Sequence, residues 1–120
     1  MSKDSIDVTK IQKKLTEFSS EREWGQFHTP KNIVMALSVE VAELVEIFQW
    51  SKNGGLDDIK DPDIKNNIED EIADVFNYLL KLVDILDLNL EEISLKKIKK
   101  NEIKYPVLKA KGIAKKYTKL

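Results

Sequence analysis

The apolar residues of this 120-residue chain recur at the spacing of an α-helix, and residues that break helices are rare. The four glycines and three prolines fall between the periodic stretches. Val8, Ile11, Leu15 and Phe18, for example, share one face of a helix. Alternating strand patterns are weak. Because the length also suits one domain, the sequence predicts a single all-α domain over residues 1–120.

The glycines, prolines and capping residues set the expected ends of the helices. Thr29 and Asn89 are good N-caps, and Pro30 suits a first helical position because it lacks an N–H group. Four helices are expected: about Ser5–Glu23, Pro30–Ser51, Asp63–Leu86, and a fourth that Asn89 caps and that ends before Pro106. The helical core thus covers about residues 5–106. Residues 107–120 form a basic tail that is either loose or packed on a partner.

Composition restricts the metal chemistry that is open to the chain. It has no cysteine and a single histidine, His28. Thiolate sites, iron–sulfur clusters and multi-histidine metal sites are therefore excluded. A metal held by side chains must sit on carboxylates, which favours hard ions and Mg²⁺ first.

Charge is balanced overall but uneven along the chain. The net charge of −1 argues against a general nucleic-acid or membrane-surface binder. Residues 40–74 hold eleven acids and three bases, whereas residues 96–120 hold ten lysines and one acid. These blocks fit either a metal and phosphate site or solvated helix faces. Charged residues interrupt every apolar run, and the first residues lack a signal pattern, so a cytoplasmic protein is expected.

Two acidic pairs fall on helix faces that should be apolar. On a helical wheel Glu40 lies within the apolar stripe of the second helix, bordered by Glu43. Glu71 and Asp74 repeat this arrangement on the third. One such acid is commonly at a rim or paired with lysine, but the same i, i+3 pair on two helices is harder to explain that way. Buried, converging carboxylates repel unless cations neutralise them, so the pattern predicts a Mg²⁺ cluster.

With their surroundings, these pairs resemble the all-α nucleoside triphosphate pyrophosphatases of MazG type. The family motif reads here as Glu40-Val41-Ala42-Glu43, twenty-seven residues, then Glu71-Ile72-Ala73-Asp74. Further segments are similar to the dCTP pyrophosphatase branch of the family: Trp24-Gly25-Gln26-Phe27-His28, Phe48-Gln49-Trp50, and Asn101 with Lys104-Tyr105-Pro106-Val107. The resemblance covers nearly the whole chain from about residue 8.

The resemblance implies that Glu40, Glu43, Glu71 and Asp74 are the catalytic residues and coordinate Mg²⁺, with Mn²⁺ as a substitute. The implied reaction hydrolyses the bond between the α and β phosphates of a nucleoside triphosphate, giving the monophosphate and pyrophosphate. A carboxylate of the first pair would take the proton of the attacking water. The sequence does not choose between Glu40 and Glu43 for this role.

The family resemblance also implies a set of residues that bind the nucleotide. The aromatic cage it implies consists of Trp24, Phe27, His28, Trp50 and Tyr78, on which a flat base could stack. Lys97 and Asn101, one turn apart on the fourth helix, match positions that contact the phosphate or sugar. Taken singly, Phe27 and Trp50 suit ordinary core packing, and His28 a structural hydrogen bond.

The resemblance further implies a four-helix bundle assembled as a homodimer or homotetramer, with sites completed across subunits. One departure is visible: Leu15 stands where mammalian members carry a substrate-facing histidine, so dCTP or a modified dCTP is the leading expected substrate and not a deduction. The leading hypothesis is a Mg²⁺-dependent pyrophosphohydrolase that cleans the nucleotide pool. The alternatives are a catalytically inactive helical interaction module and a nucleic-acid binder that uses the lysine tail.

Overall fold

The computed structural model describes residues 5–120, and every regular element in that range is helical, as the sequence predicts. The elements form two compact units, of which the first ends at Asp87 and the second comprises Leu88–Leu120. No helix within residues 5–120 is both long and apolar enough to cross a membrane.

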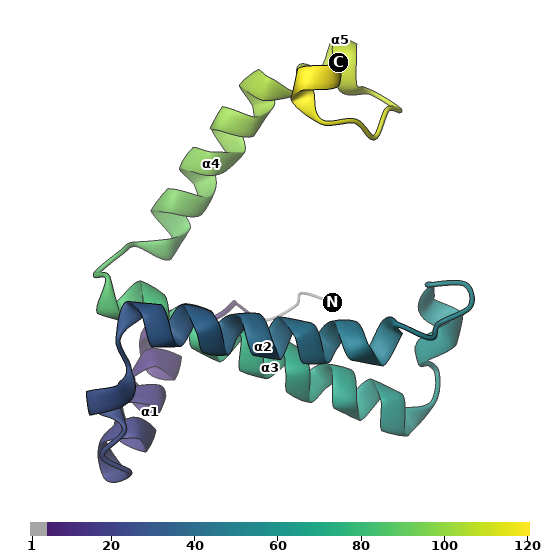
Figure 1. Cartoon of the computed structure of the whole chain (residues 1–120). Helices are drawn as coiled ribbons and strands as arrows, with labels where there is room; N and C mark the ends of the chain where they lie inside the picture. Colours follow the sequence, from purple (N-terminus) through teal and green to yellow (C-terminus); the bar gives the residue numbers. More distant parts are fainter. Residues whose placement is uncertain (1–4) are drawn as a thin grey trace. The chain divides into compact units, whose positions relative to one another are not determined.

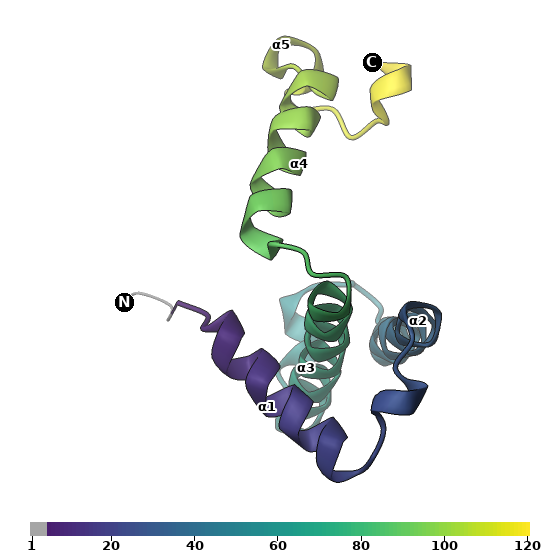
Figure 2. The same ribbon diagram turned by 90° about the vertical axis from the view of Figure 1, so that its left-hand side faces the viewer.

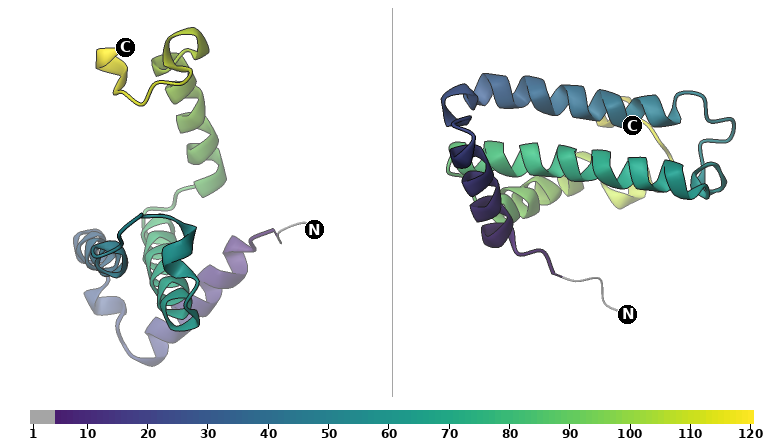
Figure 3. Two further views of the ribbon diagram at one scale, coloured as in Figure 1. Left: turned by 90° about the vertical axis from the view of Figure 1, so that its right-hand side faces the viewer. Right: turned by 90° about the horizontal axis from the view of Figure 1, so that it is seen from below.

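The first unit contains three long helices and two short 3₁₀ turns. These are α1 (Val8–Glu21), η1 (Gly25–Phe27), α2 (Pro30–Phe48), η2 (Leu56–Ile59) and α3 (Pro62–Ile85). Helices α2 and α3 run antiparallel, side by side, and α1 crosses α3 near its carboxyl end (Figures 1 and 2). The view from below in Figure 3 shows the same arrangement. The α2–α3 pair is therefore the frame on which α1 is placed.

Side-chain caps fix where the helices begin. The Thr29 hydroxyl accepts a hydrogen bond from the Asn32 amide at 3.2 Å, and Asn89 accepts one from Glu92 at 3.0 Å, so both predicted caps are confirmed. The first helix begins at Val8 and not near Ser5. The reason is Asp7, whose carboxylate accepts from the Lys10 amide at 3.0 Å and thereby makes Asp7 the cap.

The connection between α2 and α3 is organised by one carboxylate, that of Asp58. It accepts hydrogen bonds from the Ser51 hydroxyl and from the backbone amides of Asn53 and Gly54, the latter at 2.9 Å. Gly54 has a φ of +65°, which a glycine adopts without strain. The hydrogen bond from Ser51 is the main cause of a lowered Asp58 pKa. Because Ser51 and the residues after it belong to this loop, α2 ends at Phe48, before the expected end at Ser51.

The core of the first unit is small. Ile33, Ile68, Leu80 and Val83 are its buried apolar side chains, and Ser19 of α1 is buried as well. The Gln12 side chain donates a hydrogen bond to the Leu80 carbonyl at 3.4 Å, which ties α1 to α3. The second apolar stripe expected on α2 and α3 is exposed, with Val45 at 59% and Ile72 at 53% of their full accessibility. A lone copy of this unit thus leaves large apolar surface uncovered.

The second unit consists of α4 (Leu90–Lys104), the single turn α5 (Val107–Ala110) and η3 (Tyr117–Lys119). Its end folds back on α4, since the ring of Tyr117 meets that of Tyr105 edge-on at 6.0 Å. The Lys104 ammonium lies 4.9 Å from the centre of the Tyr117 ring, a cation–π geometry. Tyr117 thus contacts the end of its own helix, an arrangement that neither expected alternative, a loose tail or one packed on a partner, included.

We expect Leu80→Ala to lower the free energy of unfolding by about 2–5 kcal/mol, because it removes a fully buried side chain and leaves a cavity between the helices. Urea denaturation followed by circular dichroism measures the loss. The matched control is Leu108→Ala, at a side chain that is 100% exposed, for which a much smaller change is expected. Equal losses in the two variants would contradict this account of the core.

Candidate functional site

Three of the four predicted metal ligands meet between α2 and α3. Carboxylate oxygens of Glu40, Glu43 and Glu71 all lie within 4.8 Å of one another. Glu40 and Glu43 come from one face of α2, and Glu71 faces them from α3. This acidic cluster forms because the two antiparallel helices pack along the stripes that carry the acids.

The acidic cluster contains buried oxygen atoms that have no hydrogen-bond partner. Oε2 of Glu40 and Oε2 of Glu71 are both in this state. Burial is the main cause that raises the Glu40 pKa from its ordinary 4.5 to about 7, helped by the contacts with Glu43 and Glu71 and by the charge of Asp74. Burial likewise raises the Glu71 pKa, with Glu43 and Asp74 adding to it. Orphaned, mutually repelling carboxylate oxygens fit the needs of a divalent cation, which would supply the missing positive charge.

Asp74 lies one turn beyond Glu71 on α3 and is exposed. Its charge acts on both Glu40 and Glu71, but its carboxylate is outside the group of three whose oxygens lie within 4.8 Å. Instead Asp74 lines the cavity next to the acidic cluster. The role of Asp74 as a fourth ligand therefore stays a prediction.

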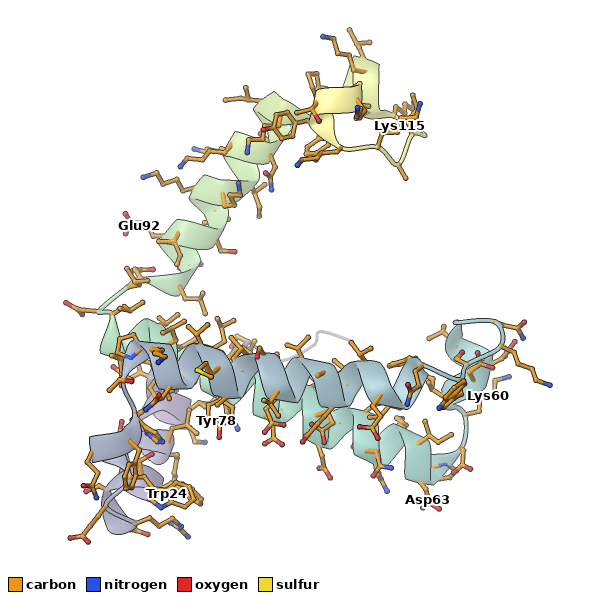
Figure 4. All side chains as sticks on the ribbon, viewed as in Figure 1. Trp24, Lys60, Asp63, Tyr78, Glu92 and Lys115 are labelled. Atoms are coloured by element: carbon orange, nitrogen blue, oxygen red, sulfur yellow. The ribbon has the colours of Figure 1, made fainter. Side chains whose placement is uncertain are left out.

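A cavity of about 870 Å³ opens beside the acidic cluster, between α1 and α3. This volume is in the range of pockets that hold small organic ligands. Ile11, Leu15 and Phe18 supply its wall on α1, while Asp74, Asn77, Tyr78 and Lys81 supply the wall on α3. Figure 4 places Trp24 and Tyr78 at the α1 end of the α2–α3 pair, away from Lys60 and Asp63.

Three members of the predicted aromatic cage line this cavity, namely Trp24, His28 and Tyr78. Trp24 is held by an edge-on contact with the Phe18 ring, 5.6 Å between centres, and its amide donates to the Ser19 carbonyl at 2.9 Å. Burial raises the Tyr78 pKa, and the charges of Glu40 and Asp74 act in the same direction, so the phenol keeps its proton and can donate a hydrogen bond.

His28 sits in the same wall as a neutral imidazole. Its pKa is lowered, first by burial and second by the positive charge of Lys81. Its Nδ1 atom is buried without a hydrogen-bond partner. The structural hydrogen bond that a lone histidine usually makes is therefore missing at Nδ1.

The other two cage members do not line the cavity within this chain. Phe27 belongs to η1, whose tight turn points the ring outward, and it is 58% exposed. Trp50 is 85% exposed and follows the far end of α2. Since α2 has 19 residues and is about 28 Å long, Trp50 is too distant from the Trp24 end to reach the same cavity. One chain alone therefore does not close the cage, Trp50 could reach such a cavity only in another copy, and a contact of Phe27 or Trp50 with a nucleotide stays a prediction.

Lys97 and Asn101 belong to the second unit, four residues apart on α4. The nearby charge of Lys104 is the largest cause that lowers the Lys97 pKa, followed by burial. Nothing in the geometry of the first unit bears on these residues, so their contact with a nucleotide stays a prediction.

Sequence reasoning missed polar residues on both sides of the cavity: Ser5, Asp7, Lys10, Lys14 and Ser19 on the α1 side, and Asn77 and Lys81 on α3. The α3 pair follows Asp74 at i+3 and i+7 and flanks Tyr78, so it extends the stripe that already carried Glu71 and Asp74. Continuing the helical wheel by two turns would have found this pair. Leu15, singled out as a departure from the family, does line the cavity.

Comparison with known proteins gives one consistent result. The family model described as MazG-like matches residues 35–120. Proteins named dCTP pyrophosphatase 1 from Mus musculus and Homo sapiens are 38% and 37% identical over 105 residues, which is 87% of this chain and 62% of each relative. The chain therefore spans less than two thirds of the length of these curated relatives.

A solved structure is similar over nearly its full length. A pyrophosphatase from Archaeoglobus fulgidus is 40% identical, superposes with a TM-score of 0.76, and is matched over 98% of its chain and 88% of this one. The two proteins are thus similar in both fold and sequence, in agreement with the family match.

The raised Glu40 pKa predicts how stability depends on pH without metal. Folding favours the protonated Glu40 carboxyl. Its contribution to the free energy of unfolding is therefore fully present below pH 4.5 and is lost as the pH rises through about 7. In a chelator we expect the thermal midpoint to fall over this interval. Glu40→Gln, which stays uncharged, should reduce the slope, whereas the exposed control Glu46→Gln should not. A slope that Glu40→Gln leaves unchanged would contradict the burial of this charge.

Proposed function

The chain belongs to the MazG-like family, and from this premise we propose that it is a nucleoside triphosphate pyrophosphohydrolase that depends on a divalent cation. The proposed reaction cleaves the bond between the α and β phosphates of a deoxynucleoside triphosphate, giving the monophosphate and pyrophosphate. The main support is the acidic cluster, whose buried carboxylate oxygens lack hydrogen-bond partners and which lies beside a cavity lined by aromatic side chains. The names of the relatives favour dCTP, or a modified dCTP, as substrate.

The acids of α2 and α3 would hold the cation, with Mg²⁺ as the expected ion and Mn²⁺ as its substitute. Glu40, Glu43 and Glu71 offer hard oxygen ligands, and Asp74 one turn further would face the same phosphates. When bound, the cation supplies charge for the phosphate oxygens and lowers the pKa of water. A carboxylate that the cation does not occupy can then take the proton of the attacking water, a role open to Glu40 and Glu43.

The cavity gives the nucleotide a direction. With the phosphates at the acidic cluster, the sugar and base extend along α3 into the cavity. Trp24 offers a ring face for stacking, His28 lines the same cavity, and the protonated Tyr78 phenol offers a hydrogen-bond donor. In this arrangement the acidic cluster takes the cation and phosphates, and the cavity takes the base.

Assembly as a homodimer or homotetramer is part of the same proposal. Exposed apolar side chains run along α2 and α3, and the described core of the first unit has four buried apolar residues. A second copy would cover such a surface and could bring its own Trp50 to the cavity. The four-helix bundle, and a contact of Lys97 and Asn101 with the phosphates, belong to this proposal through the family resemblance alone.

The two other functions are less well supported. An inactive interaction module has no use for orphaned carboxylates on a packed helix face, where they cost stability. A nucleic-acid binder is less favoured because the chain has a net charge of −1. A role in cleaning the cytoplasmic nucleotide pool fits the proposed reaction best.

The proposed reaction predicts release of pyrophosphate from a deoxynucleoside triphosphate with Mg²⁺ and none with EDTA. Glu40→Gln and Glu71→Gln should each lower kcat by about 10²-fold or more, since each removes a ligand charge from the cluster. Pyrophosphate and single phosphate are assayed separately.

The matched control is Glu46→Gln, on an exposed position of α2 outside the acidic cluster. It should retain nearly full activity with an unchanged fold. If no triphosphate is cleaved, or if the cluster variants stay fully active, the proposed function is wrong.

A site shared between copies predicts that Trp50→Ala raises KM more than it lowers kcat, because it removes stacking area and leaves the acids intact. Light scattering should show a dimer or tetramer for the wild type. A fully active monomer, or a KM that Trp50→Ala leaves unchanged, would exclude a contribution from a partner copy.

A further inference from the structure

Of the 20 lysine and arginine residues in the chain, only Arg22 is an arginine. It directly follows α1, and its guanidinium carbon lies 3.7 Å from the centre of the Phe18 ring. At the same time its Nη1 donates a hydrogen bond to the Phe18 carbonyl at 3.0 Å. A planar guanidinium can cover a ring with its face while an N–H in its plane donates, whereas the ammonium of a lysine has no flat face. This position therefore uses a property of arginine that lysine lacks.

The Phe18 ring connects Arg22 to the cavity. Phe18 and Trp24 both line the cavity, whereas Arg22 does not. The Phe18 ring meets the Trp24 ring edge-on, with 5.6 Å between the ring centres and 73° between the ring planes. Phe18 thus contacts both Arg22 and Trp24. An effect of Arg22 on a ligand in the cavity, other than through its charge, must pass through these two rings.

The backbone at Trp24 is fixed by its own turn. The Trp24 amide donates to the Ser19 carbonyl at 2.9 Å, and the Trp24 carbonyl accepts from the Phe27 amide at 2.8 Å. Glu23, just before it, has a φ of +54°, a left-handed conformation that is strained for a residue with a side chain. The Glu23 carbonyl accepts a hydrogen bond from the Gln26 side chain at 3.0 Å. The freedom that remains to Trp24 is therefore the rotation of its side chain.

Burial alone does not hold the two rings in place. Phe18 is 47% and Trp24 is 43% exposed, so a large part of each side chain has no neighbour to restrict it. The guanidinium attracts the face of the Phe18 ring, and its hydrogen bond to the Phe18 carbonyl keeps it at that ring. The exposed Glu21 carboxylate, 3.8 Å from Nη1 of Arg22, adds little, because surface ion pairs are weak. The contact with Phe18 is thus the main interaction of Arg22.

We propose that Arg22 is a positioning residue of the nucleotide site, an inference that rests on the proposed function. Its guanidinium holds the Phe18 ring, and the Phe18 ring limits the rotation of the Trp24 ring that stacks on the base. A ring that is fixed before the nucleotide arrives loses less conformational freedom on binding, so positioning strengthens binding. Arg22 therefore changes the affinity for the nucleotide and leaves the acidic cluster on α2 and α3 unaffected.

The first test is a double-mutant cycle on KM for dCTP with Mg²⁺. We expect Arg22→Gln to raise KM about 2–5-fold, the size of an exposed cation–π contact, with kcat nearly unchanged. In a Phe18→Leu background, which has no ring for Arg22 to hold, the same substitution should leave KM nearly unchanged. The control is Lys13→Gln, which removes a charge from an exposed position of α1 outside the cavity and should keep the wild-type KM.

Two outcomes of this cycle would overturn the proposal. One is an effect of Arg22→Gln that is equally large with and without the Phe18 ring, because Arg22 would then act through its charge or by direct contact. The other is a KM that Arg22→Gln leaves unchanged in the chain that retains Phe18.

The second test measures the Trp24 ring without any nucleotide. The chain has two tryptophans, so Trp50→Phe leaves Trp24 as the sole fluorophore of this kind. Time-resolved fluorescence anisotropy then reports the amplitude of its nanosecond motion. Adding Arg22→Gln should increase this amplitude, whereas adding Lys13→Gln should not. This result would stand even if the chain cleaved no triphosphate, which would refute only the proposed function. An amplitude that Arg22→Gln leaves unchanged overturns the positioning role.

Discussion

The packing of α2 against α3 buries apolar side chains, which stabilises the fold, and it brings like charges together on the same surface, which destabilises it. The stripes that hold the two helices together also carry Glu40 and Glu71, so the helices cannot pack without bringing these carboxylates into contact. The pKa of Glu40 is raised to about 7 because packing buries this carboxylate and places other acids beside it. A cation between the helices would turn this repulsion into attraction, and metal binding would then also stabilise the fold.

The cavity depends on α1 in a different way. This helix crosses α3 and is anchored by Gln12 and the buried Ser19, and the turn that follows it places Trp24 and His28 at one end of the cavity. The acidic cluster is thus built on the α2–α3 pair, whereas α1 supplies one wall of the cavity beside it. Variation on α1, such as Leu15, can alter the cavity without disturbing the acids.

Much of this arrangement is predictable from sequence because it is local. Four helices follow from apolar periodicity, and the acidic pairs stand out because charge on an apolar stripe is a property of one helix at a time. The exact ends of the helices are harder to predict, because hydrogen bonds to the side chains of Asp7 and Asp58 decide them. Sequence alone could not show that Phe27 and Trp50 do not line the cavity of their own chain, because turn geometry and the length of α2, and not residue type, determine which aromatic rings meet.

The loop that Asp58 organises lies outside the acidic cluster, yet it sets the alignment of the residues that form the cluster. Three groups converge on its carboxylate, so the chain leaves α2 and enters α3 along a fixed path. Each residue of shift along a helix rotates its side chains by about 100°, which would turn Glu71 away from Glu40. The length of the connection between α2 and α3 is therefore constrained. Its residues can vary, but only a length that keeps the rotation of α3 about its own axis leaves the two acidic pairs facing each other.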